Sequence, residues 1–189
     1  SAWRRDRIAA TARSAAASGR RCSGPRFWSR CQRTARLGTA AGFDGYEVRG
    51  LDQIGLSQKA GPVVSDLRLR RGRPAETNRL GARQADLLLA LDALVAASPA
   101  GLGVADPQRT TVVGSTSVTP TGAMIAQPGI ASPTAEALAA RLAPFTRAGE
   151  RHWADSVATT TALFGDALTA NLFVVGMAVQ AGALPVSPE

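Results

Sequence analysis

Short β-branched runs alternate with helix-like stretches between residue 37 and the end of the chain, and this alternation constrains the fold most. Residues 109–116 (RTTVVGST) form an apolar, β-branched run, which is typical of a buried strand. In residues 63–70 (VVSDLRLR) polar and apolar side chains alternate, which predicts a half-buried strand. Strands interleaved with helices indicate an α/β domain with a mostly parallel sheet.

Glycine, proline and capping signals predict the other elements. Residues 37–46 (LGTAAGFDGY) are typical of a helix end followed by a turn, because Gly42 and Gly45 interrupt them. Ser132 is expected to cap a helix that begins at Pro133. We also predict a strand at 46–50, a loop at 51–62, a turn at 71–74, a short helix and then a strand (about 93–97) within 82–98, and helices over about 151–168 and 171–182.

The length and the charge distribution limit the classes of function. A chain of 189 residues suits one domain with its own core. The first 36 residues hold ten arginines and one acid, and so carry the excess behind the formal net charge of +8. The remaining 153 residues hold twelve cations and thirteen acids, which argues against a basic face for specific nucleic-acid recognition. A protein that binds polyanions non-specifically through the basic arm remains an alternative.

Residues 1–36 differ from the rest of the chain. They are rich in arginine, serine and alanine and lack strand periodicity, so we expect them to be poorly ordered apart from a short helix at their start. A transit peptide is a second interpretation. A third is a shifted reading frame, because the codons of Phe27–Arg33 read one base earlier permit Val-Leu-Val-Thr-Val-Ser-Ala, a strand-like run. We therefore divide the chain into 1–36 and a domain at 37–189, and expect this domain to lack its first βα unit.

The sequence argues against a membrane helix, a secretory signal and a cysteine-based metal site. No apolar run approaches the roughly 20 residues that a membrane helix needs, and the first residues lack the apolar core of a secretory signal. Cys22 and Cys31 have neither a zinc nor an iron–sulfur spacing and cannot form a disulfide framework. We expect a cytoplasmic protein with no membrane partner and no metal site of its own.

The sequence IGLSQKAGPVVSD contains Lys59, the only lysine of the chain. Gly55 and Gly61 flank it and leave backbone N–H groups open to an anion, while Gln58 and Ser65 add polar groups. The stretch has neither a Gly-Lys-Ser/Thr phosphate loop nor a G-x-G-x-x-G pattern, so the pattern alone favours a solvated lysine. A loop that leads into a strand also lies at its amino end, whereas ligands of open α/β sheets collect at carboxyl ends.

Residues 114–124 (GSTSVTPTGAM) form a second candidate site. This hydroxyl-rich turn follows a predicted buried strand and therefore lies at its carboxyl end, where ligands usually bind. Thr116 and Thr119 are its candidate binding residues. The alternative is that these hydroxyl groups only satisfy the backbone of the turn.

Other polar residues are expected to be structural. His152 is the only histidine, and a triad with Ser65 or Ser115 lacks the G-x-S-x-G turn that would support it. Asp86 is interpreted as a helix-start charge and Asp92 as a helix-end or turn residue. Four arginines are expected to form a solvated rim at the end of one strand, with contact to a phosphate or to another subunit as the alternative: Arg68, Arg70, Arg71 and Arg73.

Three stretches together resemble one family over residues 37–189. Residues 49–69 (RGLDQIGLSQKAGPVVSDLRL) look like the GLAQKGGAV-S-H/D-R signature of the gamma-type domain of 2-oxoacid:ferredoxin oxidoreductases, most closely the indolepyruvate ferredoxin oxidoreductases. Residues 85–98 and 109–124 are similar to the next segments of that family. Residues 170–187 (ANLFVVGMAVQAGALPVS) resemble its last helix and the exit from it.

This sequence departs from the family pattern in two places. Ala60 and Pro62 stand where the family has glycine and a less rigid residue, which stiffens the loop. The opening G-x-G-G-x-G turn of the family is missing, and it would belong in residues 1–36. This absence is the reason why we expect the first βα unit to be lacking.

The resemblance implies a layered α/β/α, Rossmann-like fold and a part in the oxidative decarboxylation of a 2-oxo acid, such as pyruvate or indolepyruvate, to an acyl-CoA with ferredoxin as electron acceptor. It implies that thiamine diphosphate and iron–sulfur clusters lie on partner domains, that this domain binds no cofactor alone, that coenzyme A is a co-substrate, and that the chain is inactive without those partners. The residues expected nearest a phosphate group are Gly55, Gln58, Lys59, Gly61, Ser65, Thr116 and Thr119. A stand-alone CoA- or nucleotide-binding module is the alternative.

Overall fold

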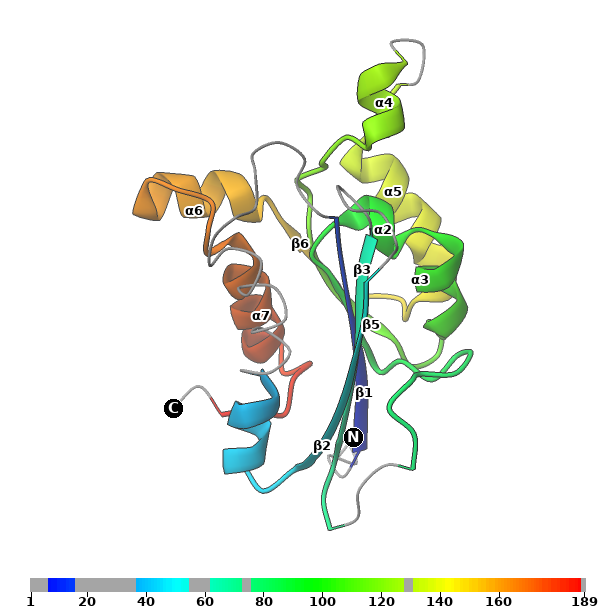
Figure 1. Ribbon diagram of the computed structural model, residues 1–189, viewed down its shortest axis with the longest axis vertical. Helices are drawn as coiled ribbons and strands as arrows, with labels where there is room; N and C mark the ends of the chain where they lie inside the picture. Colours follow the sequence, from blue (N-terminus) through cyan, green and yellow to red (C-terminus); the bar gives the residue numbers. More distant parts are fainter. Residues whose placement is uncertain (1–6, 16–36, 55–61, 73–75, 128–130, 188–189) are drawn as a thin grey trace.

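In the part of the chain that the structure describes, six strands form one sheet with helices on both faces (Figure 1). The computed structural model describes residues 7–15, 37–54, 62–72, 76–127 and 131–187. The strand order is β2-β3-β1-β4-β5-β6. The strands are β1 (Arg7–Ala15), β2 (Glu47–Ile54), β3 (Pro62–Arg70), β4 (Leu87–Ala90), β5 (Thr111–Ser115) and β6 (Arg151–Ala154).

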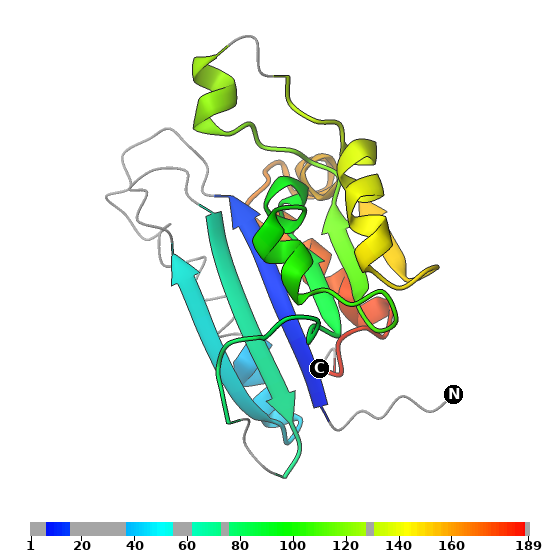
Figure 2. The same ribbon diagram turned by 90° about the vertical axis from the view of Figure 1, so that its right-hand side faces the viewer.

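Most of the sheet is parallel, as the sequence predicted. β1, β4, β5 and β6 pair in parallel, and β3 is antiparallel to both of its neighbours, β1 and β2. Figure 2 shows β3 running against the strands on either side of it. The direction of β3 matters for function because it reverses which edge of the sheet the preceding loop occupies.

The helices form two layers because successive residues of β4 point to opposite faces of the sheet. Leu87 and Leu89 pack with Val174 of one layer, whereas Leu88 packs with Leu138 of the other. Together with the helical residues 37–43, the helices are α2 (Ala93–Ala96), α3 (Pro99–Val104), α4 (Gly122–Ala126), α5 (Ala135–Leu142), the 3-10 turn η1 (Ala143–Phe145), α6 (Ser156–Phe164) and α7 (Ala170–Gln180). The predicted α/β/α layering is therefore confirmed.

Residues 37–43 and the C-terminal segment pack against one face of the sheet, at β3. Ala41 and Tyr46 pack against Leu67 and Leu69 of β3, and Val186 completes this cluster. The helix ends as predicted, with Gly45 at a φ of 78° in the turn that follows it.

Residues 7–15 form a strand where no strand was predicted. β1 pairs with β3 on one side and with β4 on the other, so it occupies the interior of the sheet. The expectation of a short helix at the start of the chain was wrong. The sequence RIAATARSA has few residues with high strand propensity, and pairing with two neighbours determines the strand instead.

The order predicted within residues 82–98 was wrong, because the strand comes first and the helix second. β4 is buried at all four residues, and Asp92 starts α2 by accepting hydrogen bonds from the N–H groups of Leu94 and Val95. Asp92 is therefore a helix N-cap. Asp86, interpreted as a helix-start charge, instead precedes β4.

Three element boundaries also differ from the prediction. β6 occupies the start of the helix predicted from about residue 151; it is a short, half-buried edge strand without a long apolar run. Thr134 caps α5 by accepting a hydrogen bond from Ala137 N–H, so the helix starts two residues after the predicted Pro133. β2 extends through Ile54, which shortens the loop predicted at 51–62.

Candidate functional site

The carboxyl edge of the sheet, at which β1, β4, β5 and β6 end, is the candidate site. Ala15 of β1 is opposite Pro62 of β3, and Ile54 of β2 is opposite Val63. Since β3 runs against its neighbours, its first residue lies at this carboxyl edge. Ile54 and Pro62, the described residues that flank the segment 55–61, therefore both lie at the edge where open α/β sheets bind ligands. The amino edge expected for this loop from the sequence was wrong for these flanking residues, because that expectation took β3 as parallel.

The predicted site residues divide into three groups. Gly55, Gln58, Lys59 and Gly61 lie outside the described residues. Ser65 is buried within β3, opposite Asp52 and Ala12. Thr116 and Thr119 follow β5 at the carboxyl edge; Thr116 is half-buried with its N–H bonded to Ala154 O at 3.0 Å, and Thr119 is exposed.

A hydroxyl cluster lies at the carboxyl ends of β5 and β6. Ser156 Oγ donates to Ser115 Oγ at 2.8 Å, and Ser117 N–H donates to the same oxygen at 3.1 Å. Ser117 Oγ donates to Asp155 Oδ1 at 2.7 Å. Thr160 Oγ1 donates to Ser156 O at 2.7 Å. The cluster fixes the turn after β5 relative to the start of α6.

Asp155 carries the charge of this cluster. Its carboxylate accepts from Ala158 N–H at 2.8 Å and caps α6. This hydrogen bond and the one from the Ser117 hydroxyl lower the pKa of Asp155 below its ordinary value. The carboxylate therefore occupies the helix N-terminus, which in other proteins attracts phosphate.

The described part of the carboxyl edge does not by itself fit a phosphate group. Asp92 caps α2 in the same way that Asp155 caps α6, so both helix starts carry a carboxylate. A phosphate-bearing substrate at this edge would need a cation, and Lys59 is the sequence's candidate for it. Hydroxyl groups after β5 can orient such a substrate without attracting its charge.

The role of Asp155 as a helix cap was not predicted. A helix was predicted from about residue 151, in place of the short strand β6 and the Asp155 cap that follows it. The available signal was the Asp155-Ser156 pair, since an Asp or Ser directly before an apolar-periodic stretch is typical of a helix start.

His152 does not join a serine triad. The oxygen of Ser115 bonds with Ser117 and Ser156, while His152 Nε2 lies 4.0 Å from Glu150 Oε2. Ser65 is three strands away from β5 in the sheet order. Within the described ranges, no group of three or more His, Cys, Asp or Glu residues could hold a metal ion.

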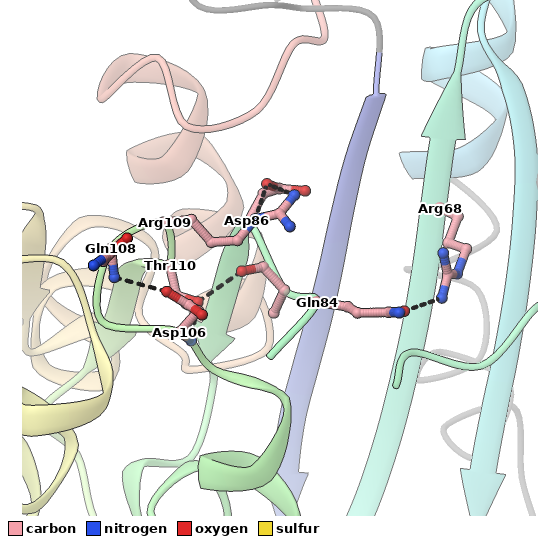
Figure 3. A network of polar contacts seen from close by, with 8 residues as sticks. Arg68, Gln84, Asp86, Asp106, Gln108, Arg109 and Thr110 are labelled. Atoms are coloured by element: carbon pink, nitrogen blue, oxygen red, sulfur yellow. Dashed lines mark hydrogen bonds and ion pairs between the residues drawn. The ribbon is translucent and has the colours of Figure 1, made fainter. Parts of the chain in front are cut away.

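The opposite, amino edge is closed by a polar network (Figure 3). Arg109 donates from Nε and Nη2 to Asp86 Oδ1, at 2.8 and 2.5 Å. Thr110 Oγ1 donates to Ala85 O at 2.6 Å and accepts from Asp106 N–H at 2.7 Å. These bonds tie the starts of β4 and β5 together.

Arg68 belongs to this network and not to a solvated rim. Its Nη2 donates to Gln84 Oε1 at 2.6 Å and to Arg79 O at 2.9 Å, as Figure 3 shows for the Gln84 contact. Arg71, another rim residue, lies over the ring of Tyr46 at 4.5 Å from its centroid. The amino edge is thus engaged in holding the fold, which leaves the carboxyl edge as the candidate site.

Comparison with known protein families identifies the family to which the chain belongs. The family described as "Pyruvate ferredoxin/flavodoxin oxidoreductase" matches residues 34–189. The chain belongs to this oxidoreductase family. The family predicted from the motifs is thus confirmed, whereas the closer relationship to indolepyruvate enzymes stays a prediction. A comparison with curated protein sequences finds no match.

Three solved structures resemble this member of the oxidoreductase family in fold. Pyruvate oxidoreductase subunit PORC of Thermotoga maritima has a TM-score of 0.57 at 11% identity, covering 96% of this chain and 80% of its own. The gamma subunit of a keto/oxoacid ferredoxin oxidoreductase of Geobacter sulfurreducens has a TM-score of 0.53 at 16% identity, covering 96% and 78%. These likenesses confirm the Rossmann-like fold predicted for gamma-type domains.

The third structure is a 2-oxoglutarate:ferredoxin oxidoreductase of Magnetococcus marinus with 2-oxoglutarate, coenzyme A and succinyl-CoA bound. Its TM-score is 0.55 at 10% identity, and the match covers 92% of this chain but only 24% of that one. The same fold therefore forms about a quarter of a longer polypeptide there.

Of the helices that the structure describes in the present chain, none is both long and apolar enough to cross a bilayer.

Proposed function

We propose that the chain is the gamma-type component of a 2-oxoacid:ferredoxin oxidoreductase. The family match over residues 34–189 carries this proposal. In the reaction, a 2-oxo acid anion and CoA thiol give an acyl-CoA thioester, carbon dioxide, one proton and two electrons, which reduce two ferredoxins. Thiamine diphosphate and the iron–sulfur clusters reside on partner domains or subunits, and CoA is the co-substrate. The chain is inactive without those partners.

The carboxyl edge is the part of this chain that we assign to the reaction. Lys59, with Gln58 and the glycines at 55 and 61, meets a phosphate of CoA or of a neighbouring cofactor. Thr116 and Thr119 donate hydrogen bonds at the same edge, and Ser65 supports the strand that the loop enters. Support for this assignment comes from the sheet register, since Ile54 and Pro62, which flank the segment 55–61, lie at the carboxyl edge. The role is positioning and exclusion of water, while the cofactors supply the electron chemistry.

We further propose that the 2-oxo acid is of the indolepyruvate type. The support is the resemblance of residues 49–69 and 170–187 to the indolepyruvate enzymes. A cytoplasmic location and the division at residue 36 remain predictions, as does the shifted reading frame.

Reconstitution tests the proposal. The full chain is produced together with the products of the genes that flank it, and ferredoxin reduction is followed with indolepyruvate, pyruvate and 2-oxoglutarate in turn. We expect reduction that requires CoA and is fastest with indolepyruvate. Lys59→Ala should raise the KM for CoA with little change in the melting temperature. Flanking genes without a thiamine-binding protein, or rates that do not depend on CoA, would contradict the proposal; faster turnover of pyruvate would contradict only the substrate.

A further inference from the structure

The turn that follows β5 is tied to the start of α6 by both backbone and side-chain hydrogen bonds. Thr116 N–H donates to Ala154 O at 3.0 Å. Ser115 Oγ accepts from Ser117 N–H at 3.1 Å and from the Ser156 hydroxyl at 2.8 Å. Ser115 and Ser156 are buried, so this part of the contact lies inside the molecule. These bonds fix the place at which the turn begins.

The hydrogen bond between Ser117 and Asp155 lies at the surface instead. Ser117 Oγ donates to Asp155 Oδ1 at 2.7 Å, and Asp155 is exposed. The same oxygen accepts from Ala158 N–H at 2.8 Å, so α6 is capped without any help from Ser117. The contact with Ser117 therefore acts on the turn and not on the helix. Because the acceptor is a carboxylate, this bond is stronger than one between two neutral groups.

Ser117 is the last residue of the turn to be anchored by a hydrogen bond before Thr119. Val118 adds an apolar contact with the core, and Thr119 is exposed. In the described part of the chain, hydrogen bonds resume at Thr121, at the start of α4. Figure 1 shows α4 standing beyond the sheet. The placement of Thr116 and Thr119 therefore depends on the anchors at the end of β5.

We propose that Asp155 and Ser117 are positioning residues for CoA, because their hydrogen bond sets the direction in which Thr116 and Thr119 meet the co-substrate. This inference rests on the proposed function, which assigns the two threonines to CoA. Asp155 and Ser117 need not touch CoA themselves. A turn that is already held in place loses less conformational freedom when CoA binds, so the bond favours binding and leaves the electron chemistry to the cofactors.

The test measures kcat and the KM for CoA of the enzyme reconstituted from the full chain and the products of its flanking genes. Ser117→Ala should raise the KM for CoA about fivefold, as expected for one lost hydrogen bond, while kcat stays within about twofold. Its melting temperature should not change, because the Asp155 cap remains. Ser117→Thr keeps the hydroxyl group and should restore the wild-type KM.

Variants of Asp155 test whether the two residues act through one bond. Asp155→Ala should raise the KM for CoA as much as Ser117→Ala does, and should also lower the melting temperature because α6 loses its cap. The double variant should raise the KM no further than either single variant, since both changes remove the same bond.

Thr159→Ala is the matched control on α6. Thr159 Oγ1 donates to Asp155 O at 2.6 Å, a bond within the start of α6 that does not reach the turn. This variant also loses a hydroxyl group bonded to residue 155, yet it should leave the KM for CoA unchanged.

The outcomes separate this inference from the proposed function. If the wild-type enzyme shows no CoA-dependent ferredoxin reduction, the proposed function and the inference both fail. If it does and Ser117→Ala keeps the wild-type KM for CoA, only the inference is wrong. Variants that lower kcat and the melting temperature without moving the KM would show a purely structural contact. Additive effects in the double variant, or a raised KM in Ser117→Thr, would contradict the inference as well.

Discussion

At the scale of single residues, two glycines of α3 differ in the space around them. A Cβ at Gly101 would lie 1.9 Å from Ala96 O, a backbone atom that cannot rotate away. At Gly103 a Cβ would meet nothing within 4 Å. Gly101→Ala is therefore expected to lower the free energy of unfolding by about 3 kcal/mol, and Gly103→Ala to raise it by up to about 1 kcal/mol. Urea denaturation of both variants measures this; equal effects would contradict the packing of α3 against α2.

The hydrogen bonds of Asp155 predict how the stability of the fold depends on pH. Hydrogen bonds from Ala158 N–H and from the Ser117 hydroxyl lower the pKa of its carboxyl group in the folded chain. A lowered folded-state pKa stabilises the fold above the unfolded value of about 4, and this contribution is lost as the pH falls below it. Asp155→Asn should thus be less stable than the wild type at pH 7 and approach it near pH 3. Denaturation curves between these values check this, and a constant difference would show that the charge of Asp155 does not matter.

At the scale of elements, removal of β1 is expected to lower the stability of the fold most. It lies between β3 and β4 and is the only link between the antiparallel and parallel parts of the sheet among the described strands. A chain that begins at residue 37 lacks β1 and is expected not to unfold cooperatively, whereas a chain that begins at residue 7 should. Thermal melts followed by circular dichroism compare the two. Cooperative melting of residues 37–189 at the wild-type temperature would mean that β1 is dispensable.

Elements with a distinctive local pattern could be predicted, and those defined by pairing could not. β5 could be predicted because it is a β-branched run, and α7 because it is a long apolar stretch that ends at Gly182. Within residues 82–98 the sequences LLLA and ALVA are both apolar, and neither shows the periodicity of a strand or a helix. The burial of all four residues of β4 and the Asp92 cap of α2 distinguish the strand from the helix. β1 and β6 are defined mainly by their neighbours in the sheet.

At the scale of the whole molecule, the site depends on strand direction. The sequence picks out residues 49–69 and the hydroxyl-rich turn, but it does not show that Pro62, the first residue of β3, lies at the same edge of the sheet as the end of β5. It follows from β3 being antiparallel, a property of the assembled sheet that no local pattern encodes. The Asp155 cap was missed for a related reason, because the strand before it is set by pairing with β5.

The charges at the carboxyl edge lead to a prediction about CoA binding. Two of the described helix starts at the carboxyl edge, those of α2 and α6, carry carboxylates, Asp92 and Asp155, which repel phosphate. Calorimetry of the full chain alone with CoA should therefore give a Kd weaker than about 10 μM, which corresponds to about −7 kcal/mol. Tighter binding would favour a stand-alone CoA-binding module. Salt-sensitive DNA binding by the full chain would favour the polyanion-binding alternative.

The central claim is that this chain is a working component of a 2-oxoacid:ferredoxin oxidoreductase. The most direct measurement is the rate of 2-oxo acid-dependent ferredoxin reduction by the reconstituted enzyme, with this chain present and with it left out. We predict a CoA-dependent rate when the chain is present and none when it is omitted or assayed alone. A rate that stays the same without the chain would contradict the account.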